Sequence, residues 1–248
     1  MKKGITKILS ACVFAFVVFL AAGTQSKAAV NMGVKQTGAG SSYVDLAWDA
    51  QLGAGHYHTQ FSQDGKNWID MDNSSSPSES VYNLTQGASY YARVVAYKGS
   101  HYTGTHVMIG VSETAIVSTK PTEVSGLTQT AAGVNSVSMS WNASAGAASY
   151  VIYGYINYNW TQIGTSATNS ATITGVAATT STRFSVAAVK NVTGGTVTGD
   201  QCSGVEMKAI PIKVSRIAMQ YYWDSLKEAK YIWTDVNNAD GYQYEVKS

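Results

Sequence analysis

The chain has 248 residues, and 13% of them are charged. Its formal net charge of +2 becomes −2 once the four N-terminal lysines are removed, because 13 basic and 15 acidic residues then remain. Neither value attracts nucleic acid or an anionic membrane surface through bulk charge. Of the two cysteines, only Cys202 lies outside the N-terminal segment, so packing without an intrachain disulfide must hold the folded domains together.

The N-terminal segment has the pattern of a secretory signal peptide. Basic residues come first, an apolar run covers residues 8–22, and the small residues Ala28 and Ala29 offer a cleavage site. The run is shorter than the roughly 20 residues that span a bilayer, which argues against a membrane anchor. Most of the run follows Cys12 instead of preceding it, which argues against a lipoprotein. We predict that residues 1–29 direct export to the outside or surface of a bacterial cell.

The rest of the chain is a tandem repeat. Three tryptophans lie 93 and 92 residues apart, and each is followed nine residues later by a tyrosine. The pairs are Trp48 with Tyr57, Trp141 with Tyr150, and Trp233 with Tyr242. A period of about ninety residues matches one β-sandwich, so the repeat predicts the architecture without indicating a ligand.

In the first repeat, apolar and polar residues alternate before the tryptophan. Val44, Leu46 and Trp48 fall on one face, which predicts a half-buried strand. Residues 57–61 continue the inward face on a second strand, with Tyr, Thr and Phe at alternate positions. An Asp-Gly pair that ends at Gly65 predicts a hairpin after this strand.

The second repeat has the same pattern. Val137, Met139 and Trp141 share one face of a strand, and Tyr150 and Ile152 share the inward face of the next. No long segment beyond the N-terminus has a period of 3.6 residues. We therefore predict an all-β chain.

These strands resemble a known family. Residues 136–141 and 148–153 are similar to strands B and C of a fibronectin type III domain, and Leu84 with Tyr90 resembles the tyrosine corner that leads into strand F. The resemblance implies tandem fibronectin type III β-sandwiches of the immunoglobulin-like class. It implies two complete sandwiches and a third that is truncated.

The expected domains are 30–119 (module 1), 120–210 (module 2) and 211–248 (a partial third module with strands A to C only). Three strands cannot close a sandwich, so we expect the chain to be truncated relative to a longer parent. Both junctions are short and contain a proline, which restricts bending. We expect a semi-extended rod with limited hinge motion.

Module 2 departs from the family pattern at the tyrosine corner. Thr182 stands where the corner tyrosine is expected, although Val176 keeps the leucine position. A buried tyrosine with its hydrogen bond contributes on the order of 1 to 3 kcal/mol, so we expect module 2 to be the less stable one. The residues expected to form the structural core are Trp48, Tyr57, Leu84, Tyr90, Trp141, Tyr150, Val176, Trp233 and Tyr242.

The sequence offers little support for catalysis. Module 2 contains three acidic residues and no histidine, so neither a carboxylate pair nor a nucleophile with a histidine base is easily assembled there. The chain lacks a Gly-x-Ser-x-Gly elbow, a glycine-rich phosphate loop and a His-Glu-x-x-His motif. We expect neither an enzyme nor a cofactor.

All four histidines lie in module 1. His56 and His58 begin strand C, and His101 and His106 lie in the connection between strands F and G. The resemblance places these segments at the same end of the sandwich, where two or three imidazoles could share a metal ion such as zinc. The alternative is four solvated histidines, and the lack of an obvious carboxylate or cysteine ligand favours it.

A platform of aromatic side chains is the best ligand-binding hypothesis. Side chains alternate along a strand, so the tyrosines between the inward positions of strand C face outward. The predicted platform comprises Tyr153, Tyr155, Tyr158 and Trp160. Ser185 and Ala187 on the neighbouring strand are expected to face outward and to leave the rings open to a sugar or a protein. The alternative is that Trp160 packs locally, like Trp68 in module 1.

Three functional classes remain. The first is a non-catalytic extracellular module array that acts as a spacer or adhesion segment. The second is the linker or carbohydrate-binding region of a secreted polysaccharide-degrading enzyme, and the third is a stand-alone receptor for a metal or a glycan. The expected partners are cell-wall or extracellular polysaccharide or another surface protein, with no nucleic acid and no membrane contact after cleavage. Fold resemblance alone does not choose among these classes.

Overall fold

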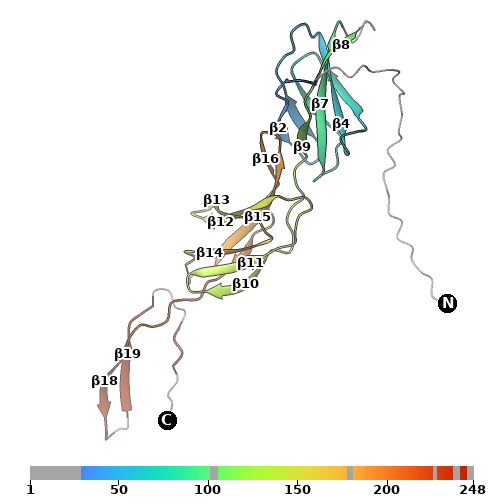
Figure 1. Cartoon of the computed structure of the whole chain (residues 1–248). Coiled ribbons are helices and arrows are strands. Elements are labelled where there is room, and N and C mark those ends of the chain that lie inside the picture. Colours follow the sequence, from blue (N-terminus) through green and yellow to red (C-terminus); the bar gives the residue numbers. More distant parts are fainter. Residues whose placement is uncertain (1–28, 101–105, 178–180, 226–227, 237–240, 245–248) are drawn as a thin grey trace, which may run out of the picture.

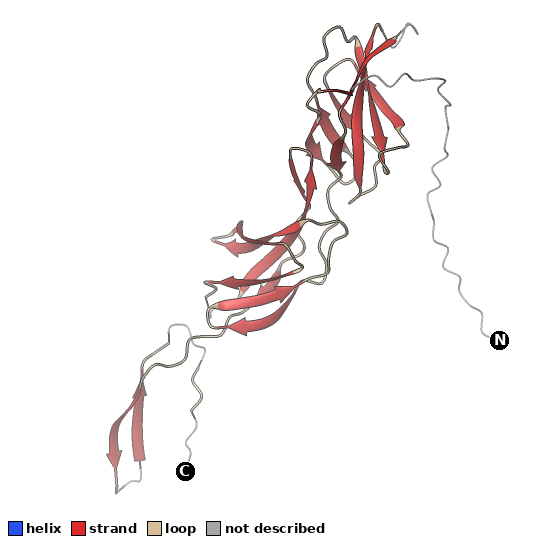
Figure 2. Cartoon of the chain, in the orientation of Figure 1, coloured by secondary structure: helices blue, strands red, loops and turns tan. Residues whose placement is uncertain are grey.

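The computed structural model describes residues 29–100, 106–177, 181–225, 228–236 and 241–244. These residues form strands and loops, as Figure 2 shows, which confirms the all-β fold class. Within this described part of the chain, no helix is long and apolar enough to cross a membrane. The predicted signal peptide, apart from Ala29, lies outside the described residues.

Module 1 is a sandwich of two sheets (Figure 1). Its strands are β1 (Ala29–Val30), β2 (Lys35–Ala39), β3 (Val44–Ala47), β4 (His56–Ser62), β5 (Ile69–Ser74), β6 (Ser78–Val81), β7 (Ser89–Lys98), β8 (Val107–Ser112) and β9 (Ala115–Ser118). One sheet has the order β2-β3-β6, and the other has the order β1-β8-β7-β4-β5, with β9 also paired to β7. Only β1 is paired in parallel, to β8; the other strand pairs of this module are antiparallel.

Module 2 repeats this arrangement. Its strands are β10 (Thr128–Gly133), β11 (Ser136–Ser140), β12 (Ser149–Ile156), β13 (Asn159–Ser166), β14 (Ser170–Thr174), β15 (Thr182–Val192), β16 (Gly195–Thr198) and β17 (Val205–Met207). The sheets have the orders β10-β11-β14 and β13-β12-β15-β16, with β17 also paired to β15. In both modules the first sheet therefore holds strands A, B and E, and the second holds strands C′, C, F and G.

Each sandwich encloses one apolar core between its sheets. The predicted inward side chains are buried at Val44, Leu46, Trp48, Tyr57, Thr59 and Phe61, and at Val137, Met139, Trp141, Tyr150 and Ile152. Leu84, Tyr90 and Val176 are buried as well. The alternation of apolar and polar residues produces this result, because every second side chain of a strand points between the sheets.

The tryptophan and tyrosine of each repeat make the same contact. Their ring centroids are 5.4 Å apart for Trp48 and Tyr57, 5.3 Å for Trp141 and Tyr150, and 5.5 Å for Trp233 and Tyr242. In each pair the tyrosine hydroxyl accepts a hydrogen bond from the backbone N–H three residues after the tryptophan, at 3.0, 3.1 and 2.7 Å. The nine-residue spacing therefore corresponds to a loop between strands B and C, and the tyrosine hydroxyl holds this loop by accepting a hydrogen bond from its backbone.

The tyrosine corner is present in module 1. The Tyr90 hydroxyl accepts a hydrogen bond from the Thr85 N–H at 3.0 Å, and Leu84 packs in the same core. In module 2 the equivalent residue is Thr182, which is only partly buried, while Val176 remains in the core. The two cores thus differ at the corner position.

A glutamine joins strands A and G in both modules. Gln36 Nε2 donates to the Ser118 carbonyl at 2.7 Å, and Gln36 Oε1 accepts from the Ser118 N–H at 2.9 Å. Gln129 makes the same two bonds to Lys208, at 2.8 and 3.1 Å. Each glutamine lies at an irregularity in strand A, where its side chain replaces part of a backbone ladder. Neither glutamine was predicted to have this role.

The third region differs from the two modules. Its described strands are β18 (Ile217–Trp223) and β19 (Glu228–Trp233), which form one antiparallel hairpin. Trp233 and Tyr242 are 37% and 39% exposed, because no second sheet covers them among the described residues of this region. The expectation that these two residues belong to a core is therefore wrong for this structure. Residues 241–244, the described part of the expected strand C, form no strand.

Candidate functional site

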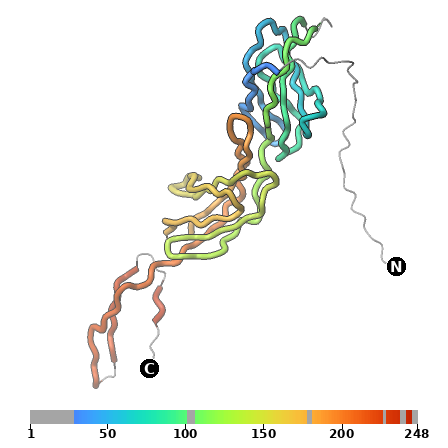
Figure 3. Tube along the Cα trace, in the orientation of Figure 1, coloured from blue at the N-terminus to red at the C-terminus, as the bar shows by residue number. Residues whose placement is uncertain are grey.

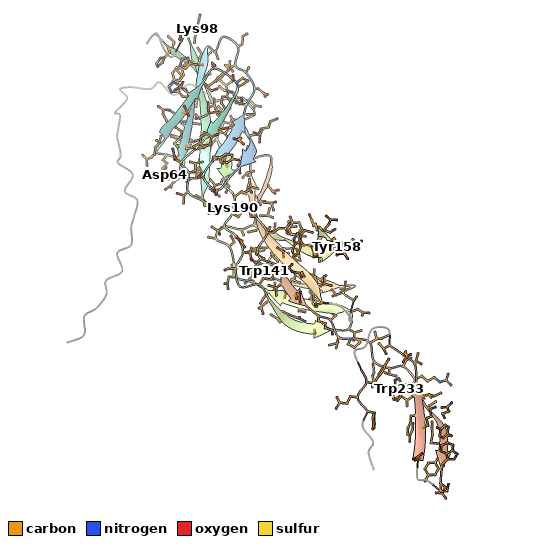
Figure 4. All side chains as sticks on the ribbon, turned by 180° about the vertical axis from the view of Figure 1, so that it is seen from behind. Asp64, Lys98, Trp141, Tyr158, Lys190 and Trp233 are labelled. Carbon is orange, nitrogen blue, oxygen red and sulfur yellow. The ribbon has the colours of Figure 1, made fainter. Side chains whose placement is uncertain are left out.

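The β12–β13 hairpin of module 2 ends in a two-residue turn, Asn157 and Tyr158. Ile156 pairs with Asn159 across this turn, and the two turn residues have φ angles of 50° and 63°. Such turns favour asparagine and glycine, because left-handed backbone crowds Cβ against a carbonyl oxygen and costs a tyrosine on the order of 1 kcal/mol. Tyr158 nevertheless occupies the tip, where its side chain is 89% exposed and projects sideways from the module (Figure 4).

Tyr155 and Trp160 lie opposite each other beside this turn. Their ring centroids are 5.3 Å apart in an edge-to-face arrangement, and the two side chains are 39% and 36% exposed. The indole lies over Gly204, where an added Cβ would come within 2.8 Å of the ring. A glycine at this position therefore lets the tryptophan rest on bare backbone.

The exposed part of the predicted platform is a tip cluster of three rings: Tyr155, Tyr158 and Trp160. Tyr153 is partly buried and lies outside this cluster. The expectation that Ser185 and Ala187 leave an open platform is wrong, since both side chains are fully buried. Ser185 Oγ donates to the Cys202 carbonyl at 2.7 Å, so the segment between β16 and β17 covers this part of β15.

The second tryptophan of module 1 has a different environment. The Arg93 guanidinium lies 4.0 Å from the centre of the Trp68 ring, and burial lowers the pKa of this arginine. Arg93 Nε donates to Gln60 Oε1 at 2.7 Å, and Gln60 Nε2 donates to Asp70 Oδ1 at 2.6 Å. Trp68 is thus held under a cation in a side-chain network, whereas in module 2 the second tryptophan contacts a tyrosine and bare backbone.

A histidine cluster lies in module 1. The centroid of the His56 ring is 5.4 Å from those of His58 and His106, which are 6.1 Å from each other. Tyr97 packs against all three imidazoles, at 5.2, 4.9 and 5.0 Å. The predicted meeting of strand C with the F–G connection therefore brings three of the four histidines together.

The surroundings of this cluster bear on its chemistry. His56 is buried, and its Nδ1 lies 3.0 Å from the Gly99 carbonyl. Burial raises the pKa of Tyr97, and the negative charge of Asp70 adds to this effect. Among the residues described, no group of three or more His, Cys, Asp and Glu side chains is arranged to hold a metal ion. His101 lies outside the described residues, so the zinc site stays a prediction.

A third group of residues joins the modules. The β15–β16 hairpin of module 2 reaches up to module 1, as the tube in Figure 3 shows. At its tip, the Thr193 N–H donates to the Ile116 carbonyl at 2.8 Å, and Thr193 Oγ1 accepts from the Ile116 N–H at 2.7 Å. Ile116 belongs to β9, so the hairpin covers the outer edge of that strand.

Lys190 lies on the same hairpin and points into the joint (Figure 4). Its side chain is buried, Nζ donates to the Gly87 carbonyl of module 1, and burial lowers the pKa of the ammonium group. Lys98 holds the same position in the first repeat, 92 residues earlier, but is exposed at the far end of module 1. The sequence pattern is the same at both lysines, so it does not predict that one of them is buried.

The linker itself is bonded to both modules. The Lys120 ammonium pairs with the Asp200 carboxylate of module 2 at 2.6 Å. The Lys120 N–H donates to the Gly40 carbonyl at 2.9 Å, and the Lys120 carbonyl accepts from the Gly87 N–H at 3.0 Å. Pro121 is buried. It packs closely against Gly199 of module 2, where a Cβ atom would lie only 3.1 Å from the Pro121 carbonyl oxygen. The predicted proline junction is therefore packed on both sides.

Comparison with known proteins finds similarity among solved structures. No family model matches the chain, and no curated protein matches it. Among solved structures, the chain is similar to the chicken CNTN1 FN1-FN3 domains, with 14% identity and a TM-score of 0.42 over 73% of this chain and 68% of that chain. It is also similar to a two fibronectin type III domain segment from chicken tenascin, with 15% identity and a TM-score of 0.36 over 71% of this chain and 97% of that chain. By their strand order, the two complete modules are tandem β-sandwiches of the fibronectin type III type.

Proposed function

We propose that this chain is a non-catalytic extracellular spacer that holds its modules in one extended arrangement. The joint between modules 1 and 2 is the observation that carries the proposal. Two contacts of the β15–β16 hairpin cross it, the paired bonds of Thr193 with Ile116 and the bond from Lys190 to Gly87. In addition, Lys120 joins module 1 through its backbone bonds to Gly40 and Gly87, and its ammonium group pairs with Asp200 of module 2.

These contacts act together against bending. Sandwiches joined by a short linker move relative to each other unless their interface resists the motion. A rotation at this joint separates Lys190 Nζ from the Gly87 carbonyl and Thr193 from Ile116 at the same time, because the hairpin that carries both is continuous with the F strand of module 2. The joint thus favours one orientation, and the modules follow each other end to end (Figure 1).

The extracellular location rests on the predicted signal peptide, and the lack of a catalytic role rests on the missing motifs. A spacer needs neither a reactive group nor a deep cleft; it needs a fixed length and a stable joint. The accessory region of a polysaccharide-degrading enzyme is the second candidate, and the exposed rings of the tip cluster favour it.

Distance measurements between the modules test the spacer. Spin labels are placed on cysteines introduced at the exposed positions Leu52 and Ala167, with the buried Cys202 replaced by serine. We expect one narrow distance population in the parent chain. The double variant Lys190→Ala and Thr193→Ala should broaden it, because both contacts of the hairpin with module 1 are weakened.

Lys98→Ala is the matched control, since Lys98 has the same repeat position without a neighbouring module in contact. It should leave the distance distribution unchanged. A broad distribution in the parent chain would contradict a rigid joint. A narrow one in the double variant would contradict the proposal that the contacts of Lys190 and Thr193 hold the joint.

A further inference from the structure

The tip cluster combines a strained backbone with exposed rings. Four non-glycine residues have positive φ angles among the residues described, and three of them are asparagines: Asn83, Asn135 and Asn157. The fourth is Tyr158, at the most exposed point of its hairpin. Glycine or asparagine would relieve the strain at no loss of packing, since the side chain is 89% exposed. The fold therefore does not explain the tyrosine, and strain of this kind points to a function.

Two further exposed rings lie beside the turn that carries this tyrosine. Tyr155 and Trp160 flank the turn on opposite strands, and their edge-to-face contact holds both rings beside it. Gly204 lets the Trp160 indole lie close to the backbone, because any side chain at this position would push the ring outward. Two of the three rings are thus already positioned before a ligand arrives, which reduces the entropy cost of binding.

Neutral amides surround the rings. Asn157 and Asn159 lie in and next to the turn, where Asn159 Nδ2 donates to the Asn157 carbonyl at 3.2 Å, and Gln162 is exposed on β13. Arg183 is the charged residue that lies near Gly204, beside Trp160. Amide side chains both donate and accept hydrogen bonds, as hydroxyl groups require. This composition fits a ligand that is neutral, rich in hydroxyl groups and flat on one side.

The area of the cluster argues for a small ligand. Fully exposed aromatic side chains present about 150–250 Å² each, so the three rings together expose roughly 350 Å² at their observed exposures. A stable protein interface needs about 800 Å² on each partner. The rings cover less than half of that, whereas two or three sugar rings would span them.

We propose that the tip cluster binds a neutral β-linked polysaccharide chain, with sugar rings stacked on Tyr158 and Trp160. A β-1,4-linked pyranose chain has equatorial substituents, so each ring presents a face of C–H groups to the negative face of an aromatic ring. The asparagine and glutamine amides bond the hydroxyl groups at the edge of the sugar. This function is additional to that of the spacer and does not depend on the joint.

Titration calorimetry of the full chain with cellohexaose and with chitohexaose tests the proposal. We expect binding of at least one of the two, and at least ~10-fold weaker binding in Tyr158→Gly and in Trp160→Ala, since each loses a stacked ring. Tyr158→Gly also separates binding from folding. Glycine is favoured at this φ, so the thermal midpoint of module 2 should stay the same or rise by a few degrees while affinity falls.

Tyr82→Ala is the control, because Tyr82 is an exposed tyrosine of module 1 that is 57% accessible and lies outside the cluster. Its affinity should equal that of the parent chain. Amide NMR shifts on titration should centre on Asn157, Tyr158 and Asn159. The proposal is overturned if neither oligosaccharide binds, if the shifts map elsewhere, or if Tyr158→Gly binds like the parent. It is also overturned if sedimentation shows that Tyr158→Gly abolishes self-association, which would make the cluster a contact between copies.

Discussion

Modules 1 and 2 have the same strand order but differ in the side-chain contacts and exposed loops that they carry. Module 1 has the tyrosine corner, a cation over its second tryptophan and a histidine cluster. Module 2 lacks the corner tyrosine, exposes its second tryptophan beside a strained turn, and extends a hairpin onto its neighbour. The shared contacts maintain the sandwich, and the differences give each module its own surface. The comparison can be tested one contact at a time.

The largest effect is expected from the repeated tryptophans. Trp48→Ala and Trp141→Ala should each cost about 3–5 kcal/mol of unfolding free energy in their own module, because each removes a buried indole and leaves a cavity. Trp233→Ala should cost less than about 1 kcal/mol, since this ring is exposed. Denaturant unfolding monitored by amide NMR assigns each loss to a module.

Phenylalanine variants are the control for these tryptophans. Within the described residues, neither the Trp48 nor the Trp141 indole N–H reaches a hydrogen-bond acceptor. Trp→Phe therefore loses volume without losing a bond, and it should cost less than Trp→Ala at both sites. A loss at Trp233 as large as that at Trp141 would show that the third region has a core like that of the modules.

The tyrosine corner gives the next largest effect. Tyr90→Phe removes the acceptor of the Thr85 N–H and should cost about 1–3 kcal/mol in module 1. Thr182→Ala, the equivalent change in module 2, should cost about 0.5 kcal/mol or less, because a threonine has no phenol group to form the corner bond. Thermal unfolding of the parent chain should show module 2 melting first. A parent chain in which module 2 melts last would refute the expected order.

A smaller loss of stability is expected from changing the side chain that accepts a backbone N–H of strand F in each module. Ser112 Oγ accepts the Val94 N–H at 2.8 Å in module 1, and Cys202 Sγ accepts the Val186 N–H at 3.2 Å in module 2. Cys202→Ser should cost only about 1 kcal/mol, because a hydroxyl can accept the same bond. Cys202→Val should cost more, since it leaves the Val186 N–H unpaired in the core. Equal losses in urea unfolding would show that the bond contributes nothing.

The smallest expected effect is an acid response limited to the hairpin of module 1. The Asp64 carboxylate accepts hydrogen bonds from the Asn67 and Lys66 backbone N–H groups, which hold its pKa well below the ordinary value of 3.8. A lowered pKa in the folded state contributes stability above pH 3.8 that is lost as the pH falls below it. Hydrogen exchange of the Asn67 backbone amide should therefore become faster in acid, relative to the intrinsic rate of an unprotected amide at the same pH.

The turn of module 2 serves as the internal comparison for this acid response. Its two residues, Asn157 and Tyr158, carry no carboxylate, so the protection of the neighbouring amides should not change over the same pH range. Asp64→Asn should remove the response in module 1. An equal response in both turns would show that acid acts on the whole sandwich.

Local patterns in the sequence determined the fold of each module. The alternation around Trp48 and Trp141 depends only on residues a few positions apart, and it predicted which side chains enter the core. The nine-residue spacing to Tyr57 and Tyr150 predicted a repeated unit, and the structure shows the same ring contact in both modules. The resemblance to a known sandwich, in contrast, led to the expectation that strand C and the F–G connection lie at one end, where His56, His58 and His106 lie together.

Only the tertiary structure decided what these modules present to their surroundings. Lys98 and Lys190 occupy the same repeat position, yet one is exposed and the other is buried, because Gly87 of the neighbouring module lies 103 residues from Lys190 along the chain. Ser185 and Ala187 alternate as outward residues but are buried. A local pattern specifies the face of a strand to which a side chain points, whereas burial depends on which distant segment covers that face.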